Sequence, residues 1–136
     1  MLTKINFPKI NDPRGNLTFL QYPEQIPFEI KRVSWIYDVP GGKQCSGYAC
    51  KKQKEVIVAL SGSFDVVISG DDGKEERVTL NRSYFGLMIS PMTWRRLENF
   101  STNAISLHLS DCLYDEDDYI WEEKEYFAQL NRHETK

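Results

Sequence analysis

The stretch that decides the fold is KQCSGYACKK at residues 43–52, followed by EVIVALSGS at residues 55–63. The second segment is rich in β-branched residues and ends in a Ser-Gly-Ser turn sequence. Together the two segments predict a strand, a tight turn and a second strand. Because side chains alternate between the two faces of a strand, Ser46, Tyr48 and Cys50 are expected to share one face.

The rest of the chain repeats this pattern of short strands. Turn signals such as Gly41-Gly42 separate segments that are rich in β-branched and aromatic residues. The predicted strands are Leu2–Phe7, Asn16–Tyr22, Ile30–Val39, Gln44–Lys51, Glu55–Leu60, Phe64–Ser69, Glu75–Leu80, Tyr84–Ile89, Thr93–Asn99 and Ala104–Ser110. Helical periodicity appears only near the C-terminus, where Trp121, Tyr126 and Leu130 lie among charged residues. We therefore predict an all-β jelly-roll β-barrel with a short C-terminal α-helix, whose open mouth is the natural place for a ligand.

The composition is that of one ordinary globular domain over residues 1–136, with 40% hydrophobic residues, 27% charged residues and a net charge of -3. The basic residues are scattered, so nucleic acid is not expected as a partner. No apolar run approaches the roughly 20 residues of a membrane-spanning helix, so no membrane association is expected. Three cysteines without a recognisable secretion signal favour reduced thiols and a cytoplasmic protein.

Four ordered patterns carry a family resemblance across nearly the whole chain. They are Asp12-Pro13-Arg14-Gly15-Asn16-Leu17; Ile26–Val33 followed by Ile36-Tyr37-Asp38; Ala49-x-Lys51-Lys52 leading to Leu60-x-Gly62-Ser63; and Pro91-x-x-Trp94 with the later Tyr114–Ile120. Together they resemble the cupin-fold sugar-nucleotide 3,4-ketoisomerases, which act on dTDP-4-keto-6-deoxyglucose. The resemblance implies a cupin domain, a homodimer, a dTDP-linked sugar ligand and a place in deoxysugar synthesis for surface polysaccharides.

The catalytic segment of that family reads approximately Arg-Gly-Phe-His-Ala-His-Lys, and it falls on residues 45–51 of this chain. Cys45 stands in place of the arginine, and Tyr48 and Cys50 stand in place of the two histidines. Two hypotheses follow. The chain is an isomerase with altered acid/base groups or a different substrate, or it is a non-catalytic cupin that binds a nucleotide sugar or a biosynthetic partner protein.

Moving a carbonyl from C4 to C3 of a sugar passes through an enediol, so it needs groups that remove and return a proton. Tyr48 and Cys50 are the candidates that the resemblance places at the acid/base positions, although such residues often only fill a pocket wall. His108 is a third candidate, because alternation puts it on one strand face with Ser106 and Ser110. The alternative for His108 is a hydrogen-bonded interior histidine without a catalytic role.

The predicted substrate-binding residues are Arg14, Arg32, Trp35, Tyr37, Lys51, Glu55, Trp94 and Arg95. The arginines could hold phosphate oxygens and the aromatic residues could stack on a thymine or a sugar face, against the alternatives of surface ion pairs and core packing. Glu55 replaces what is commonly a glutamine in the family and could be a displaced acid/base group, although a surface glutamate at a strand end is the simpler interpretation. Two histidines cannot assemble a metal-binding cupin site, so we expect no metal and no cofactor.

Overall fold

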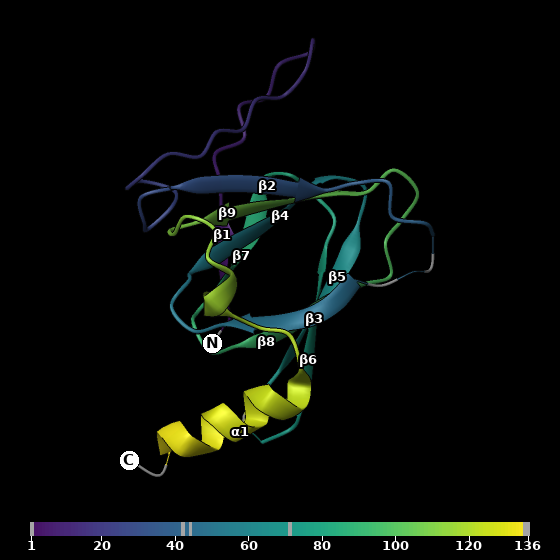
Figure 1. The fold of residues 1–136 in the computed structure, drawn as a ribbon. Coiled ribbons are helices and arrows are strands. Elements are labelled where there is room, and N and C mark those ends of the chain that lie inside the picture. Colours follow the sequence, from purple (N-terminus) through teal and green to yellow (C-terminus); the bar gives the residue numbers. More distant parts are fainter. Residues whose placement is uncertain (1, 42, 44, 71, 135–136) are drawn as a thin grey trace.

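The structure is a computed structural model that describes residues 2–41, 43, 45–70 and 72–134, without the side chains of residues 45, 46 and 132–134. Within these residues the chain forms two five-stranded antiparallel sheets. In the first sheet the strand order is β1 (Leu2–Asn6), β7 (Phe85–Ile89), β4 (Glu55–Ser61), β9 (Ile105–Ser110) and β2 (Arg32–Ile36). In the second sheet the order is β10 (Tyr119–Ile120), β3 (Cys45–Cys50), β8 (Trp94–Glu98), β5 (Phe64–Ser69) and β6 (Glu75–Leu80). Figure 1 shows the two sheets facing each other.

The predicted all-β jelly roll is confirmed, and its two sheets form a sandwich and not a closed barrel. Each sheet keeps its own edge strands, and β2 and β10 are two of these edges. The gap between these two edges is crossed by side chains, because Arg32 Nη2 donates to the Tyr119 hydroxyl at 2.8 Å. This contact joins side chains only. The backbones of β2 and β10 are not paired with each other, so the sandwich is open between these two strands.

The core between the sheets is apolar at one end. Directly paired residues of neighbouring strands share a face, so Ile57 and Ala59 of β4 point into the sandwich with their β9 partners His108 and Ser106. The apolar side chains packed there are buried Ile57, Ala59, Phe64, Val66, Ile68, Leu80, Leu87, Ile89, Leu97, Phe100 and Ala104. This core fixes the distance between the sheets, and the polar inward-facing side chains occupy the remaining space.

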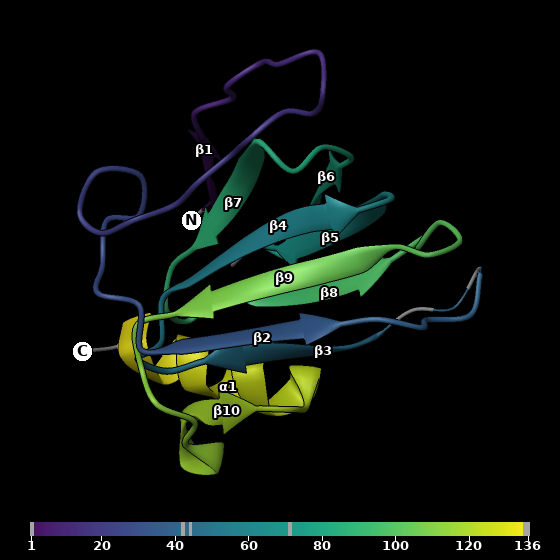
Figure 2. The same cartoon turned by 90° about the horizontal axis from the view of Figure 1, so that it is seen from above.

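The outer faces of both sheets are also covered. Phe7, Ile26 and Phe28 of the N-terminal segment pack on Val56 and Leu109 of the first sheet. Figure 2 shows this segment descending from the arm and passing beside the ends of β4 and β9 before the chain enters β2.

The helix α1 (Glu123–Glu134) covers the second sheet from outside (Figure 1). Tyr126 of this helix packs on Ala49, Trp94 and Ile120, and its hydroxyl donates to the Met92 carbonyl at 3.1 Å. The predicted C-terminal helix is therefore confirmed, and a short 3₁₀ turn, η1 (Glu116–Asp118), comes before it.

One predicted strand is wrong. Residues 16–22 form no strand, and only Leu17 makes an isolated bridge, to Ile10. The turn between them is closed by the Gly15 amide on the Asp12 carbonyl at 2.9 Å. Residues 8–20 form an arm that projects away from the sheets (Figure 1), so the alternation of apolar residues there belongs to an exposed surface. The N-terminal strand exists and pairs with β7 of the same chain.

Candidate functional site

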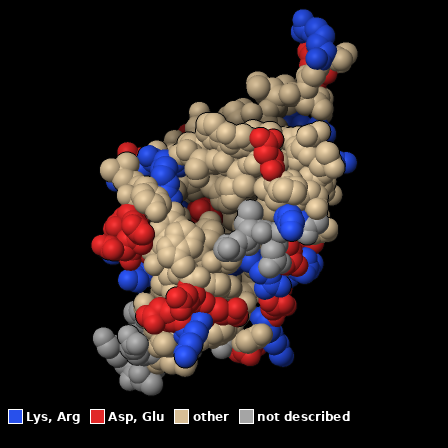
Figure 3. All heavy atoms as spheres, turned by 45° about the vertical axis from the view of Figure 1, so that its right-hand side comes forward, with Lys and Arg blue, Asp and Glu red and all other residues tan. Residues whose placement is uncertain are grey.

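Polar side chains from both sheets meet inside the sandwich. Glu55 of β4 and His108 of β9 come from the first sheet, and Tyr48 of β3 and Arg95 of β8 come from the second. The strand register explains the meeting, because Tyr48 is paired with Arg95 and therefore shares the inner face with it. Figure 3 shows a hollow in this side of the molecule with acidic atoms in its depth.

The Glu55 carboxylate is the centre of this cluster and is only 3% exposed. Arg95 Nη2 donates to its Oε1 at 3.1 Å, and the Tyr48 hydroxyl donates to the same oxygen at 2.9 Å. Gln53 Nε2 donates to Oε2 at 3.4 Å, and His108 Nδ1 lies 3.5 Å from Oε1. Both carboxylate oxygens are therefore occupied, and the alternative of a surface glutamate is wrong.

Burial alone would raise the pKa of Glu55. The Arg95 charge, His108 and the Tyr48 hydrogen bond outweigh burial and lower this pKa to about 2. Arg95 is fully buried; burial opposes its charge, but the neighbouring Tyr48 and Glu55 raise its pKa above the usual value. The interior therefore holds a permanent ion pair near neutral pH.

Tyr48 and Cys50 both reach this ion pair, as the alternation of β3 predicted. The Arg95 guanidinium lies 4.2 Å from the centre of the Tyr48 ring, and its Nη2 lies 3.7 Å from Cys50 Sγ. Burial, with the nearby Glu55 charge, raises the pKa of Tyr48 well above its usual value. Burial also raises the pKa of Cys50 to about 12. Both groups are therefore protonated near neutral pH, so neither of them supplies a base.

His108 lies in the interior with the two serines of its strand face, as predicted. His108 is 4% exposed, Ser106 0% and Ser110 2%. His108 Nε2 lies 2.9 Å from Ser106 Oγ, while its Nδ1 faces Glu55. The imidazole is thus held at both nitrogens, and it can exchange a proton only with groups of this cluster or with a ligand that displaces one of them.

Several residues near the open edge of the sandwich were missed by the sequence analysis. Gln53, Tyr119 and Trp121 were not among the candidates, although Tyr119 belongs to the fourth sequence pattern. Gln53 Oε1 accepts from Arg32 Nη2 at 2.5 Å, and the Tyr119 and Trp121 rings stack at 4.9 Å. A polar residue just before a buried apolar run was the available signal for Gln53.

Other predicted binding residues lie away from the interior. Arg14 is on the arm, with a 92% exposed side chain paired to Asp12, and Lys51 is exposed. Trp35 is paired with Leu107, whose side chain packs on the outer face of the first sheet, so Trp35 also faces outward. Trp94 is 5% exposed and lies beneath α1. The structure therefore brings together Tyr48, Cys50, Glu55, Arg95 and His108, with Arg32 beside them through Gln53.

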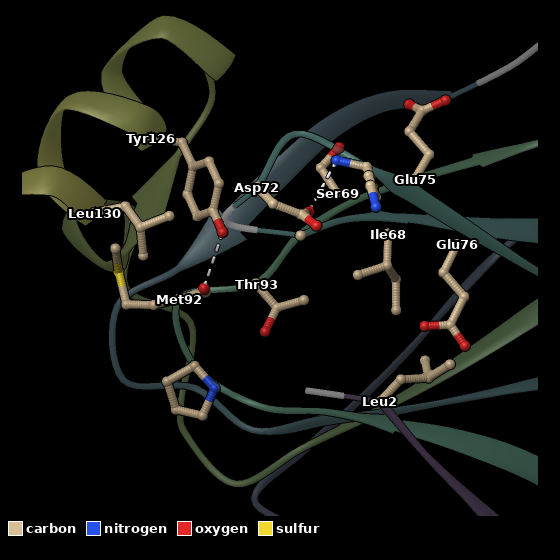
Figure 4. A pocket seen from close by; sticks show the side chains of 13 residues that line it. Leu2, Ile68, Ser69, Asp72, Glu75, Glu76, Met92, Thr93, Tyr126 and Leu130 are labelled. Carbon is tan, nitrogen blue, oxygen red and sulfur yellow. Dashed lines mark hydrogen bonds between the residues drawn. The ribbon is translucent and has the colours of Figure 1, made fainter. Parts of the chain in front are cut away.

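A second hollow, of about 580 Å³, lies outside the sandwich between α1 and the β5–β6 hairpin. Figure 4 shows Tyr126 and Leu130 on one side of it and Glu75 and Glu76 on the other. None of the predicted site residues lines it. The polar cluster inside the sandwich, not this hollow, matches the sequence predictions.

Within the residues that the structure describes, no group of three or more His, Cys, Asp or Glu side chains is arranged to hold a metal ion. In the same part of the chain, no helix has the length and apolar character needed to cross a membrane.

The fold and the interior cluster together define a jelly-roll protein with a polar hollow, and comparisons with known proteins identify its family. The family model described as "FdtA: WxcM-like, C-terminal" matches residues 2–131. A TDP-4-oxo-6-deoxy-alpha-D-glucose-3,4-oxoisomerase from Aneurinibacillus thermoaerophilus is 38% identical over 131 residues, which cover 93% of each chain. The chain therefore belongs to the FdtA/WxcM-like family of sugar-nucleotide 3,4-ketoisomerases.

Solved structures agree with this assignment. A 3,4-ketoisomerase from Helicobacter canadensis has a TM-score of 0.91 and 35% identity, covering 96% of this chain and 97% of that one. The sugar 3,4-ketoisomerase QdtA from Thermoanaerobacterium thermosaccharolyticum, solved in complex with TDP, has a TM-score of 0.93 and 32% identity, covering 97% of this chain and 96% of that one. A mutant of QdtA was solved in complex with TDP-4-keto-6-deoxyglucose.

Proposed function

We propose that this chain binds a dTDP-linked 4-keto-6-deoxyhexose in the hollow of the sandwich and interconverts its 4-keto and 3-keto forms. The observation that carries the proposal is the buried cluster around Glu55, on a scaffold that matches TDP-sugar ketoisomerases over nearly its full length. The cluster offers an anion, a cation and several proton donors within one hydrogen-bonded unit, which suits a reaction through an enediolate.

The reaction is balanced within the sugar. A base removes the proton at C3, the C–H electron pair forms a C3=C4 double bond, and O4 takes a proton. The O3 hydroxyl then loses its proton while C4 gains one, which leaves the carbonyl at C3. The isomerisation is redox-neutral, so the protein has to supply only proton transfer and stabilisation of the negative charge on the enediolate.

The interior groups divide between these tasks. Tyr48 and Cys50 stay protonated, since burial raises the pKa of both groups, so they could donate hydrogen bonds to O4 although they are weak acids. The Arg95 cation could stabilise charge that develops on the sugar oxygens. Glu55 is the ionised group, and His108 lies beside it, so these two residues are the candidate bases. No histidine occupies the two positions where the family resemblance places its pair.

This arrangement supports slow turnover. A carboxylate whose pKa is lowered to about 2 is a weak base, and its efficiency in proton transfer falls accordingly. The same observation favours a second candidate function, in which the chain binds the nucleotide sugar without turning it over. The two functions share one binding site and differ in whether the C3 proton is removed.

Proton exchange decides between the two functions. We expect that incubation of dTDP-4-keto-6-deoxyglucose with the protein in D₂O replaces the C3 proton by deuterium faster than in a sample without protein, as followed by proton NMR. Glu55→Gln removes the carboxylate while keeping the residue that is common in the family, and it should abolish the exchange if Glu55 is the base. If the wild type binds the sugar nucleotide but exchange equals the protein-free rate, the second function is correct.

We infer a homodimer from an exposed apolar surface on the first sheet. The edge strand β2 and the residue that follows it expose Val33 at 49%, Trp35 at 57% and Tyr37 at 60%. On the arm, Ile10 and Leu17 are more than half exposed. Large exposed apolar side chains on the edge strand of a sheet are typical of a subunit contact, and the family resemblance supports a second copy of this chain as the occupant.

The same resemblance supports a role in deoxysugar synthesis for surface polysaccharides and a cytoplasmic location. Fractionation of cells that carry a tagged full-length chain would test the location. The prediction fails if the tagged protein is recovered in the membrane pellet or in the culture medium.

A further inference from the structure

Ser106, His108 and Glu55 form a row on the inner face of the first sheet. Ser106 and His108 both belong to β9 and share a strand face. Glu55 of β4 is paired with Ser110, which makes it a diagonal neighbour of His108 on the same face. Ser106 Oγ lies 2.9 Å from His108 Nε2, and Glu55 Oε1 lies 3.5 Å from His108 Nδ1. The two nitrogens of the imidazole therefore face two different partners, a hydroxyl and a carboxylate.

The contact with Ser106 anchors the ring, because it is the shorter of the two. A separation of 2.9 Å is that of an ordinary hydrogen bond, whereas 3.5 Å between His108 Nδ1 and Glu55 Oε1 is long for one. A hydroxyl can either donate to an imidazole nitrogen or accept from it. The distance to Ser106 alone therefore leaves the direction of the hydrogen bond open, and the charges around His108 select it.

The carboxylate selects a hydrogen on Nδ1. Glu55 is ionised near neutral pH and can only accept, so it attracts a hydrogen on the nearer imidazole nitrogen and repels a lone pair there. Arg95 already neutralises Glu55 through its contact at 3.1 Å, so a second buried cation at His108 would have no counterion of its own. The geometry thus favours a neutral imidazole with its hydrogen on Nδ1, and the Ser106 hydroxyl donates to the lone pair of Nε2.

The surroundings of Ser106 give it no other use for its hydroxyl. Ser106 is paired with Ala59 of β4 and with Ile36 of β2, so its neighbours across both ladders are apolar. In the part of the chain that the structure describes, its hydroxyl makes one hydrogen bond, the one with His108. A fully buried hydroxyl beside apolar residues is costly unless it is hydrogen-bonded, so the contact with His108 is what stabilises a serine at this place.

We propose that Ser106 is a positioning residue for the proton transfer. It anchors His108 in the tautomer with the hydrogen on Nδ1, and His108 in turn directs this N–H to Glu55. The lone pair of Nε2 is then occupied by the Ser106 hydroxyl, so His108 has no free lone pair for the C3 proton of the sugar. Of the two candidate bases, this assigns the proton removal to Glu55. The inference rests on the proposed function and specifies how the site divides its roles.

The tautomer can be measured without any substrate. His108 and His133 are the two histidines of the chain, so a ¹⁵N-labelled His133→Gln protein contains one imidazole. Its long-range ¹H–¹⁵N NMR spectrum near neutral pH shows which nitrogen carries the hydrogen. We expect this reference protein to have the hydrogen on Nδ1, and Ser106→Ala in the same background to show a mixture of the two tautomers. Ser106→Thr keeps the hydroxyl and should give the reference spectrum again.

Ser110→Ala is the matched control for the spectrum. Ser110 lies on the same face of β9 and is also buried, but its hydroxyl donates to the Cys112 carbonyl at 3.2 Å and not to His108. This variant should keep the hydrogen of His108 on Nδ1. A change as large as that in Ser106→Ala would show a general disturbance of the interior and contradict the role of Ser106. If Ser106→Ala does not fold, Ser106→Cys takes its place, because a thiol is only a weak donor.

The effect on the reaction is measured by exchange of the C3 proton of dTDP-4-keto-6-deoxyglucose in D₂O. Ser106→Ala should slow the exchange at saturating sugar nucleotide by about 3- to 10-fold, which is the expected effect of losing one hydrogen bond that supports the base. The concentration that gives half the maximal rate should stay the same, and Ser106→Thr should recover most of the rate. A weaker apparent affinity with an unchanged maximal rate would contradict a positioning role.

Failure of this inference can be told apart from failure of the proposed function. If the reference protein carries the hydrogen on Nε2 or on both nitrogens, or if Ser106→Ala leaves the spectrum unchanged, Ser106 does not position His108 and the proposed function stands. If the wild type binds the sugar nucleotide but does not accelerate C3 exchange, the proposed isomerisation fails. The assignment of Glu55 as the base then fails with it, whichever tautomer the spectrum shows.

Discussion

At the scale of single residues, the Arg95–Glu55 ion pair decides the electrostatics of the interior. Both side chains are almost fully buried, so each has lost the solvation that would stabilise its charge in water. The pair is tolerated because Glu55 also accepts hydrogen bonds from Tyr48 and Gln53. Removing one partner leaves an uncompensated buried charge, which costs far more than the pair itself contributes.

Arg95→Met should lower the free energy of unfolding by about 3–5 kcal/mol, because it leaves the Glu55 charge buried without its cation. Adding Glu55→Gln should recover part of this loss, since the second substitution removes the buried carboxylate that has lost its cation. Urea denaturation of the wild type, both single variants and the double variant measures the coupling. Additive losses would show that the two side chains do not interact.

The pH dependence of stability has a defined sign. The folded pKa of Glu55 is lowered to about 2 from a usual value of 4.5, so its contribution to stability is fully present above pH 4.5 and is lost as the pH falls from there toward 2. Over that range the wild type should lose on the order of 3 kcal/mol more than Glu55→Gln. Thermal unfolding followed between pH 2 and pH 6 gives the comparison, and parallel curves for the two proteins would contradict the assignment.

Alternation along a strand is local, and it predicted from the sequence that Tyr48 and Cys50 share one strand face and that His108 shares one with Ser106 and Ser110, whereas the inward direction of the Tyr48 face was implied only by the family resemblance. The burial of Glu55 could not be predicted in the same way, because its partner Arg95 is 40 positions away and no local signal pairs them. Trp35 shows the other limit: alternation says which residues share its face but not which face of the sheet points inward.

At the scale of elements, the turn between β4 and β5 depends on Gly62. This glycine has a φ of +65°, and a Cβ there would come within 2.8 Å of the Ala104 backbone. Gly73, in the β5–β6 turn, has a φ of +82° but has nothing within 4 Å of such a Cβ. The two turns therefore share the backbone requirement and differ only in the space beside the glycine.

Gly62→Ala should consequently destabilise the protein more than Gly73→Ala. The left-handed conformation costs about 1 kcal/mol or more for either alanine, and the contact with Ala104 adds to the cost at position 62. Chemical denaturation of the two variants measures the difference. Equal losses would mean that the Ala104 segment moves aside without cost.

Most strands could be predicted because β-branched runs and glycine turns are local signals. The strand predicted at residues 16–22 of the arm is not formed, because this segment has strand-like alternation but no neighbouring strand with which to form a hydrogen-bonded ladder. The distinction between a barrel and a sandwich could not be predicted either, because it depends on whether two distant edges, β2 and β10, come within backbone hydrogen-bonding distance.

At the scale of the whole molecule, the exposed apolar surface on β2 predicts the oligomeric state. We expect sedimentation at micromolar concentration to show a species of about twice the 15.9 kDa chain mass. Trp35→Lys places a charge in the inferred contact and should shift the protein to the monomer, whereas Lys51→Ala, on an exposed loop, should not. A wild type that sediments only as a monomer would contradict the dimer.

The central claim is that the ketoisomerase scaffold is retained while its acid/base groups have changed. The most direct test is the initial rate at which dTDP-4-keto-6-deoxyglucose is converted to its 3-keto isomer, measured by NMR for the wild type and for Tyr48→His combined with Cys50→His, with Cys45→Arg added in a third protein. We expect a slow wild type and a histidine variant that is faster by up to about 10²–10⁴-fold, because that is the typical contribution of a positioned acid/base group. A wild type that turns over rapidly, and that loses this rate in Tyr48→Phe or Cys50→Ser, would contradict the claim and show that the phenol and the thiol are effective catalysts.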